Sequence, residues 1–252
     1  NIASRKQIAD RLQAKGWEPT QMTEKGNVII NEAVLSKIKL PEAKMFNRYF
    51  LLQKRTGLLK SWIMACQEDN RVRGSVMTLR TITGRMAHAV PNMAQVPAVY
   101  SPYGRECRGL WTVDDVSKYR LVGVDASGLE LRCLAHYMND PEYTNIVLTG
   151  DVHTANQERA GLKTRDQAKT FIYAFLYGAG AAKIGKVVGG TAKHGQQLIT
   201  RFLNNMPALK HLRMLVSKEA AGDTIKALDG RLLHIRSEHA ALNTLLQGAG
   251  AI

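Results

Sequence analysis

The sequence predicts a helix-rich α+β protein. Short apolar runs at residues 71–83 and 119–125 indicate strands, and residues 224–235 indicate a hairpin that turns at Asp229-Gly230. Most of the remaining chain has apolar residues at helical spacing, bounded by Ser, Thr, Asn, Pro or Gly. At 252 residues the chain is long enough for a substantial core and for one or two domains.

The first half is predicted to hold helices and one strand, each with a local start or stop signal. In order, they are a helix capped by Ser4 and ended by Gly16, a short helix after Asn31, a core helix over 45–63, a strand over 71–83 that ends at Gly84, and a proline-containing loop over 91–102.

The second half is predicted to be mostly helical after one buried strand. That strand, YRLVGV at 119–124, ends at Asp125, and the hairpin and a helix capped by Ser237 complete the chain. Between them we expect helices over 127–139, 152–160, 165–188, 192–204 and 207–220, the third ending at Gly189-Gly190.

The charge of the chain indicates a polyanionic partner. Residues 1–66 carry 12 Lys and Arg against 5 Asp and Glu, residues 67–150 carry 9 against 9, and residues 151–252 carry 14 against 7. Two basic flanks therefore enclose a segment of balanced charge, in which some carboxylates can serve a function. Nucleic acid is the first partner to expect and a membrane surface the second, although a solvated basic surface explains the charge equally well.

Cysteine usage and hydropathy indicate a cytoplasmic protein. Cys66, Cys107 and Cys133 are odd in number and form no CxxC, which fits a reducing compartment. The longest apolar run, residues 171–182, is too short to span a bilayer, and the polar N-terminus is not a signal peptide. Because the sequence begins without an initiator Met, we expect a fragment of a longer protein.

A stripe of four residues marks residues 164–178, TRDQAKTFIYAFLYG. Arg165, Lys169, Tyr173 and Tyr177 follow one another at steps of four, so on a helix they share one slowly winding face. Two cations suit a triphosphate, and two rings suit a sugar and a base. Few ordinary core helices need that order.

Asp125 follows the predicted strand at 119–124 and is a candidate metal ligand. A carboxylate there can hold Mg²⁺, with the backbone carbonyl of Ala126 as a second hard oxygen. An isolated Asp in this place more often caps the next helix. Glu130 and Arg132 in DASGLELR, together with the stripe downstream, favour the metal site.

Several motifs resemble, in order, those of family A DNA polymerases, the class of bacterial DNA polymerase I. DASGLELRCLAH resembles motif A, and TRDQAKTFIYAFLYGAG resembles motif B, the fingers helix that closes over the incoming nucleotide. TGRMAHAVPNMAQVPA resembles the element that tracks the primer–template, and GDVHTAN and HAALNTLLQGAGA also match family segments. The resemblance covers nearly the whole chain, and the motif sequences are most similar to those of the replicative polymerases of short-tailed phages.

The resemblance implies a catalytic role for Asp125, Arg165, Lys169 and Tyr173. Asp125 would bind two catalytic Mg²⁺ ions, with the Ala126 carbonyl on one of them. The side chains that would bind the dNTP are Glu130 at the sugar 2′ position, where it excludes ribonucleotides, His153, Arg165 and Lys169 on the triphosphate, and Tyr173 near the sugar 3′ position. Primer and template would contact Arg85, Gln95, Tyr177, Arg236, His239, Asn243 and Gln247. Capping or solvation explains His239 equally well.

The resemblance also implies a right-hand polymerase fold. Its parts would be a thumb remnant at 1–66, the first part of a palm with an antiparallel sheet at 67–136, complete helical fingers at 137–242 and the start of a second palm segment at 243–252. The second metal-binding carboxylate of the family lies in an HDE hairpin that this sequence lacks. We therefore expect the segment alone to be inactive or nearly so.

The expected partners are primer–template DNA and dNTPs, in phage replication in the cytoplasm of an infected bacterium. Phage relatives also use a host thioredoxin, through a region that would precede residue 1. Two other functions stay open: a single-subunit RNA polymerase, against which Glu130 argues because it blocks the 2′ position, and a non-catalytic DNA-binding module.

Overall fold

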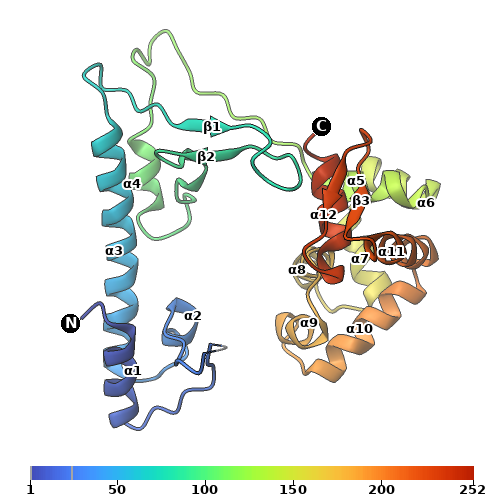
Figure 1. The fold of residues 1–252 in the computed structure, drawn as a ribbon, viewed down its shortest axis with the longest axis horizontal. Helices are drawn as coiled ribbons and strands as arrows, with labels where there is room; N and C mark the ends of the chain where they lie inside the picture. Colours follow the sequence, from blue (N-terminus) through green and yellow to red (C-terminus); the bar gives the residue numbers. More distant parts are fainter. Residues whose placement is uncertain (1, 24) are drawn as a thin grey trace. The chain divides into compact units, whose positions relative to one another are not determined.

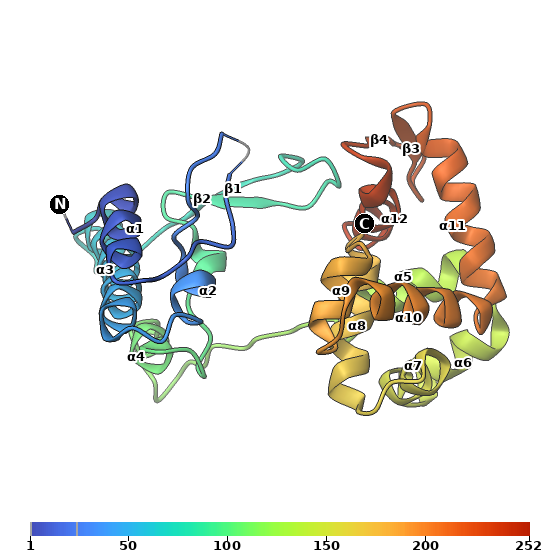
Figure 2. The same ribbon diagram turned by 90° about the horizontal axis from the view of Figure 1, so that it is seen from below.

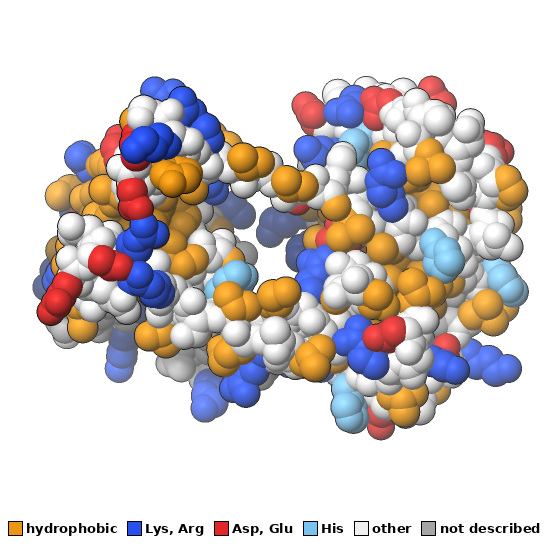
Figure 3. All heavy atoms as spheres, turned by 90° about the horizontal axis from the view of Figure 1, so that it is seen from above, with side chains coloured by type: hydrophobic (Ala, Val, Ile, Leu, Met, Phe, Trp, Pro, Cys, Tyr) orange, Lys and Arg blue, Asp and Glu red, His pale blue; other side chains and the backbone are white. Residues whose placement is uncertain are grey.

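The computed structural model describes residues 2–23 and 25–252. Its contacts divide the chain into two compact units (Figures 1 and 2). Unit 1 comprises Asn1–Ser75 and His88–Leu121, and unit 2 comprises Val76–Ala87 and Val122–Ile252. Lys and Arg side chains reach the surface of both units, among apolar and acidic ones (Figure 3).

Unit 1 is built along one long helix, α3. Its helices are α1 (Arg5–Ala14), α2 (Glu32–Leu35), α3 (Pro41–Ala65), the 3-10 helix η1 (Met93–Gln95) and α4 (Gly104–Gly109). The side chains of Ser4 and Asn31 cap α1 and α2 as predicted. The third helix begins before residue 45 because Pro41 occupies its first turn, where a missing N–H costs nothing. The short helix α4 was not predicted.

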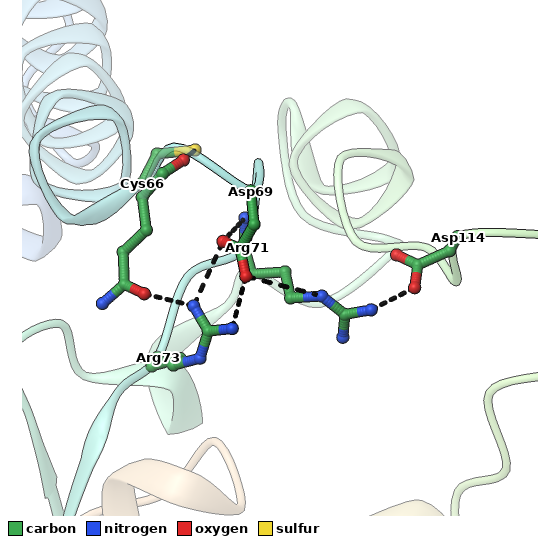
Figure 4. Close-up of polar contacts among 6 residues, drawn as sticks. Cys66, Asp69, Arg71, Arg73 and Asp114 are labelled. Carbon is green, nitrogen blue, oxygen red and sulfur yellow. Dashed lines mark hydrogen bonds and ion pairs between the residues drawn. The ribbon is translucent and has the colours of Figure 1, made fainter.

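The loop after α3 is closed by ion pairs (Figure 4). Cys66 and Val72 form an isolated antiparallel bridge. Asp69 accepts hydrogen bonds from the guanidinium of Arg73, at 2.5 Å from Nη2, and these bonds are the main cause of the lowered pKa of its carboxyl. Arg71 pairs with both Asp69 and Asp114. These pairs are exposed, so they fix the shape of the loop more than they stabilise the fold.

The predicted strand over 71–83 is wrong in extent. Only β1 (Ser75–Met77) is a strand, and it pairs with β2 (Ala87–Ala89), which was not predicted. Leu79 has a φ of 55°, a left-handed conformation that cannot continue a strand. The chain then turns at Gly84, where φ is 82° and the Thr81 hydroxyl donates to the Arg85 carbonyl at 2.8 Å.

The predicted buried strand at 119–124 is also wrong. In the part of the chain that the structure describes, this segment belongs to no strand, and Leu121 and Val124 are 67% and 94% exposed. A strand exists only where a neighbour takes its N–H and C=O groups. The apolar composition of residues 119–124 therefore predicted a strand, but no neighbouring strand pairs with this segment among the described residues.

Unit 2 is a helical body with one hairpin. Its elements are α5 (Leu129–Met138), α6 (Pro141–Thr149), α7 (Val152–Ala160), α8 (Arg165–Leu176), α9 (Ala181–Val187), α10 (Ala192–Asn204), α11 (Pro207–Ala220), β3 (Thr224–Lys226), β4 (Leu232–His234), η2 (Glu238–Ala240) and α12 (Ala241–Ala249). The strands pair antiparallel, with Ile225 opposite Leu233, as the Asp229-Gly230 turn predicts. Helix α6, which Asp140 caps, was not predicted.

The core of unit 2 fixes α8 between its neighbours. Phe171 and Phe175 of α8 meet Phe202 of α10 edge to face, with ring centroids 5.1 and 5.5 Å apart. Helix α7 packs on α8, and α12 packs on α5 and the hairpin (Figures 1 and 2). One face of α8 is therefore buried, which leaves the opposite face for other contacts.

The single helix predicted over 165–188 is wrong, because it is broken into α8 and α9. The break lies at Gly178, whose φ is 74°. A Cβ at this position would lie 2.1 Å from the carbonyl oxygen of His239. Glycine is thus required both by the left-handed turn and by the close approach of η2. Ser237 precedes η2 without a side-chain capping bond, so its predicted role as a cap is also wrong.

Candidate active site

Four segments of unit 2 meet around one cavity of about 540 Å³. They are the turn after β1, the start of α5, the outer face of α8 and the residues after α12. Their lining residues are Gly84, Arg85, Met86, Asp125, Ala126, Gly128, Leu129, Glu130, Tyr173, Gly250 and Ala251. The cavity therefore brings together Asp125, Glu130 and Tyr173, which the sequence had singled out from two separate motifs.

Asp125 is an exposed residue that lines this cavity. It does not cap α5, because the N-cap residue is Gly128, at a φ of 61°, and no side-chain bond caps the helix. This geometry removes the capping explanation for the carboxylate.

The carboxylate of Asp125 and the carbonyl of Ala126 are hard oxygen donors, the kind that Mg²⁺ prefers. Among the described residues no group of three or more His, Cys, Asp and Glu is arranged to hold a metal ion. Mg²⁺ is commonly held by one or two carboxylates together with substrate phosphates. The two residues present therefore offer two of the oxygen ligands that such a site needs.

Glu130 is held by Arg85 at the side of the cavity. Nη2 of Arg85 donates to Oε1 of Glu130 at 3.2 Å, and the two side chains are 37% and 18% exposed. Burial, followed by the charge of Glu130, raises the pKa values of the Cys133 thiol and the Tyr173 phenol. Glu130 is thus a fixed negative charge close to Tyr173.

Helix α8 presents its aromatic residues as a stack. The rings of Tyr173 and Tyr177 lie 6.4 Å apart at an interplanar angle of 28°, and Tyr177 is the C-cap residue of the helix. The imidazole of His153 lies 6.2 Å from the Tyr173 ring. The four-residue spacing therefore brings the two tyrosine rings together, and His153 of α7 adds a third ring beside them.

The cationic end of α8 lies next to the start of α7. Arg165 forms two hydrogen bonds with Asp151, and Lys169 is exposed one turn later. The pKa of His153 is lowered by burial and then by the positive charge of Arg165. In the described chain its Nδ1 is buried without a hydrogen-bond partner. Positive charge and an unpartnered ring nitrogen thus gather in one place.

Asp151 was missed by the sequence analysis. It is the N-cap residue of α7, and hydrogen bonds from Arg165 and then Thr154 hold the pKa of its carboxyl well below the usual range. The cap position could have been found from the Asp that begins DVHTAN. Its pairing with Arg165 depends on how α7 packs on α8, and the sequence carries no local signal for that.

The residues predicted to contact DNA are placed in both units. On α12, Nε2 of Gln247 donates to Oδ1 of Asn243 at 3.2 Å. Arg236 and His239 are exposed just before that helix. The carbonyl of His239 approaches Gly178, next to Tyr177, so these residues and α8 belong to one surface of unit 2. Gln95 is exposed on η1 in unit 1 and is not part of this set.

Comparison with known proteins agrees with these motifs. The family model described as DNA polymerase family A matches residues 1–251. The chain is 44% identical to the DNA-directed DNA polymerases of Enterobacteria phage T3 and Escherichia phage T7, in alignments that cover all of the chain and 41% of each relative. It is 42% identical to that of Escherichia phage Phieco32, over 82% of the chain and 47% of the relative. The chain thus spans less than half the length of these relatives.

A solved structure matches the fold of the whole chain. It is the POL domain of Pol1 from M. smegmatis in complex with DNA primer-template and dNTP. The TM-score is 0.81 at 20% sequence identity, and the match covers 100% of this chain and 48% of that one. No helix among the described residues is long and apolar enough to cross a membrane. The family match and the phage relatives together show that the chain belongs to DNA polymerase family A.

Proposed function

We propose that this chain is the nucleotide-binding part of a DNA polymerase that extends a primer along a template, in phage replication. The observation that carries the proposal is the cavity where Asp125 and Glu130 meet Tyr173, a residue of the same helix, α8, that carries Arg165 and Lys169. The relatives from phages T3 and T7 are named DNA-directed DNA polymerase, which supports the reaction class.

Asp125 and the Ala126 carbonyl hold Mg²⁺ in this proposal, two ions in the complete enzyme. Bound Mg²⁺ supplies positive charge to the reacting phosphate and its oxygens. Each ion needs more oxygen ligands than these two residues offer, so further ligands come from the triphosphate and from the rest of the protein. We propose for this reason that the isolated chain is inactive or nearly so.

The triphosphate binds to Arg165, Lys169 and His153. The planar guanidinium of Arg165 can donate two parallel hydrogen bonds to phosphate oxygens, and Lys169 adds a point charge. The imidazole of His153, which lies beside the Tyr173 ring, is a third contact. Charge spreads over the phosphate oxygens during transfer, so fixed cations there favour the transition state.

Glu130 and Tyr173 select the sugar. Glu130, held by Arg85, occupies the space that a 2′-hydroxyl would need, and Tyr173 packs near the 3′ position. This assignment favours a DNA polymerase over a single-subunit RNA polymerase, which must leave the 2′ position open.

Primer and template contact residues of both units. The proposed contacts are Arg85, Gln95, Tyr177, Arg236, His239, Asn243 and Gln247. Amide and guanidinium donors can read the acceptors that every base pair presents in the minor groove, so such contacts test pair shape without reading sequence. In the complete protein we assign 1–66 to the thumb, 67–136 and 243–252 to the palm, and 137–242 to the fingers. A thioredoxin-type processivity factor would bind outside this chain, in the cytoplasm of the infected host.

Primer extension by the complete parent protein tests the proposal. Asp125→Asn should lower single-nucleotide incorporation by at least about 100-fold, the scale expected when one electrostatic group at a reacting centre is lost. Asp10→Asn, an exposed change on α1, is the matched control. Preference for ribonucleotides, or full activity of Asp125→Asn, would overturn the assignment. DNA binding without incorporation would instead favour a non-catalytic module, and extension by the isolated chain at the parent's rate would refute its inactivity.

A further inference from the structure

The carboxylate of Asp151 joins the first turns of α7 and α8. As the N-cap of α7, it accepts hydrogen bonds from the backbone N–H groups of His153 at 3.0 Å and Thr154 at 3.4 Å, and from the Thr154 hydroxyl at 2.8 Å. On its other side it accepts from Nε and Nη2 of Arg165, at 2.6 and 3.1 Å. One carboxylate thus connects two of the proposed phosphate-binding residues.

The ion pair between Asp151 and Arg165 sets the orientation of the Arg165 guanidinium. Two parallel hydrogen bonds to a carboxylate fix both the position and the plane of the group. They use Nε and Nη2, and they leave Nη1 without a hydrogen bond to any described residue. An exposed arginine without such a partner would populate many rotamers, and a ligand would have to order it.

We propose that Asp151 is a positioning residue for the incoming triphosphate. Asp151 holds Arg165 in place before the nucleotide arrives. It also keeps the first turn of α7, which carries His153, next to Arg165. The inference rests on the proposed function, because it assigns Arg165 to the phosphates. Asp151 itself contacts no phosphate, since two negative groups would repel each other.

Asp151→Asn separates positioning from capping. Asparagine caps helices as well as aspartate does, so α7 keeps its start, but a neutral amide cannot form the paired, charged contact with Arg165. Asp140→Asn is the matched control, because Asp140 caps α6 through the N–H of Tyr143 and pairs with no arginine among the described residues.

Steady-state incorporation by the complete parent polymerase provides the measurement. Asp151→Asn should raise the KM for dNTP about tenfold, the scale of a lost charge-assisted hydrogen bond, and should change kcat much less. Asp140→Asn should leave both parameters at their wild-type values. Both variants should still unfold in one cooperative thermal transition, which shows that the KM change does not reflect a loss of folded enzyme.

A double-mutant cycle with Arg165→Ala decides the mechanism. If Asp151 acts through Arg165, Asp151→Asn adds little to the KM of the Arg165→Ala enzyme. Additive effects, an unchanged KM, or a lower KM in Asp151→Asn would each overturn the inference. Arg165→Ala alone tests the proposed function: an unchanged KM there would refute phosphate binding by Arg165 and not merely the role of Asp151.

Discussion

Arg85 donates a hydrogen bond from Nη2 to Oε1 of Glu130 at 3.2 Å, from the turn after β1 to the first turn of α5. The pair joins two motifs that lie far apart in the sequence. It also explains how a mostly buried carboxylate keeps its place at the side of the cavity, because an unpaired charge there would be costly.

Glu130→Ala should relax sugar selection in the complete polymerase. The shorter side chain opens the space at the 2′ position. We therefore expect the ratio of kcat/KM for dNTP to kcat/KM for NTP to fall by about 10- to 200-fold, the discrimination that a pocket typically achieves by excluding a small group. Glu130→Gln keeps the volume and should keep most of the discrimination. Equal ratios in wild type and Glu130→Ala would refute the assignment.

Local signals predicted much of the fold. Ser4 and Asn31 each cap a helix through their own side chain, as predicted, and a cap depends on residues only three or four positions away. The hairpin at Asp229-Gly230 is equally local. The stripe on α8 was predicted for the same reason, since helical geometry alone places Tyr173 next to Tyr177.

Non-local contacts account for the failures. The break at Gly178 depends on the backbone of His239, and the pairing of Asp151 with Arg165 depends on how two helices pack. Residues 119–124 have the composition of a strand, but a strand is defined by its neighbour. The family could be identified without any of these contacts, because its motifs follow one another in the sequence along nearly the whole chain.

Tyr173→Phe should change the use of dideoxynucleotides. Burial and then the charge of Glu130 raise the pKa of the Tyr173 phenol, so the hydroxyl stays protonated at neutral pH and can donate in place of a missing sugar 3′-OH. Without it, discrimination against ddNTP should rise by about 10-fold or more, the value of one hydrogen bond to a charged group. Competition between ddNTP and dNTP in primer extension measures this ratio, and an unchanged ratio would remove the role.

Gly178→Ala should destabilise unit 2. The added Cβ lies 2.1 Å from the His239 carbonyl, and alanine in a left-handed conformation costs at least about 1–3 kcal/mol where the surroundings hold it there. Gly222→Ala is the control, since its Cβ meets only the Glu219 carbonyl at 3.7 Å and φ is not positive. Urea unfolding followed by circular dichroism compares the two, and equal midpoints would contradict the packing.

Nucleotide binding should couple to proton uptake at His153. Burial and the charge of Arg165 lower the pKa of the imidazole, so without ligand it is mostly neutral at pH 7. A triphosphate stabilises the charged form and raises that pKa, so the KM for dNTP should fall as pH decreases from neutrality towards the unliganded pKa. The triphosphate and the solvent titrate over the same range, so His153→Gln provides the reference. Its KM should vary less with pH than the wild-type KM, and parallel pH profiles for the two enzymes would show that His153 does not contact the phosphates.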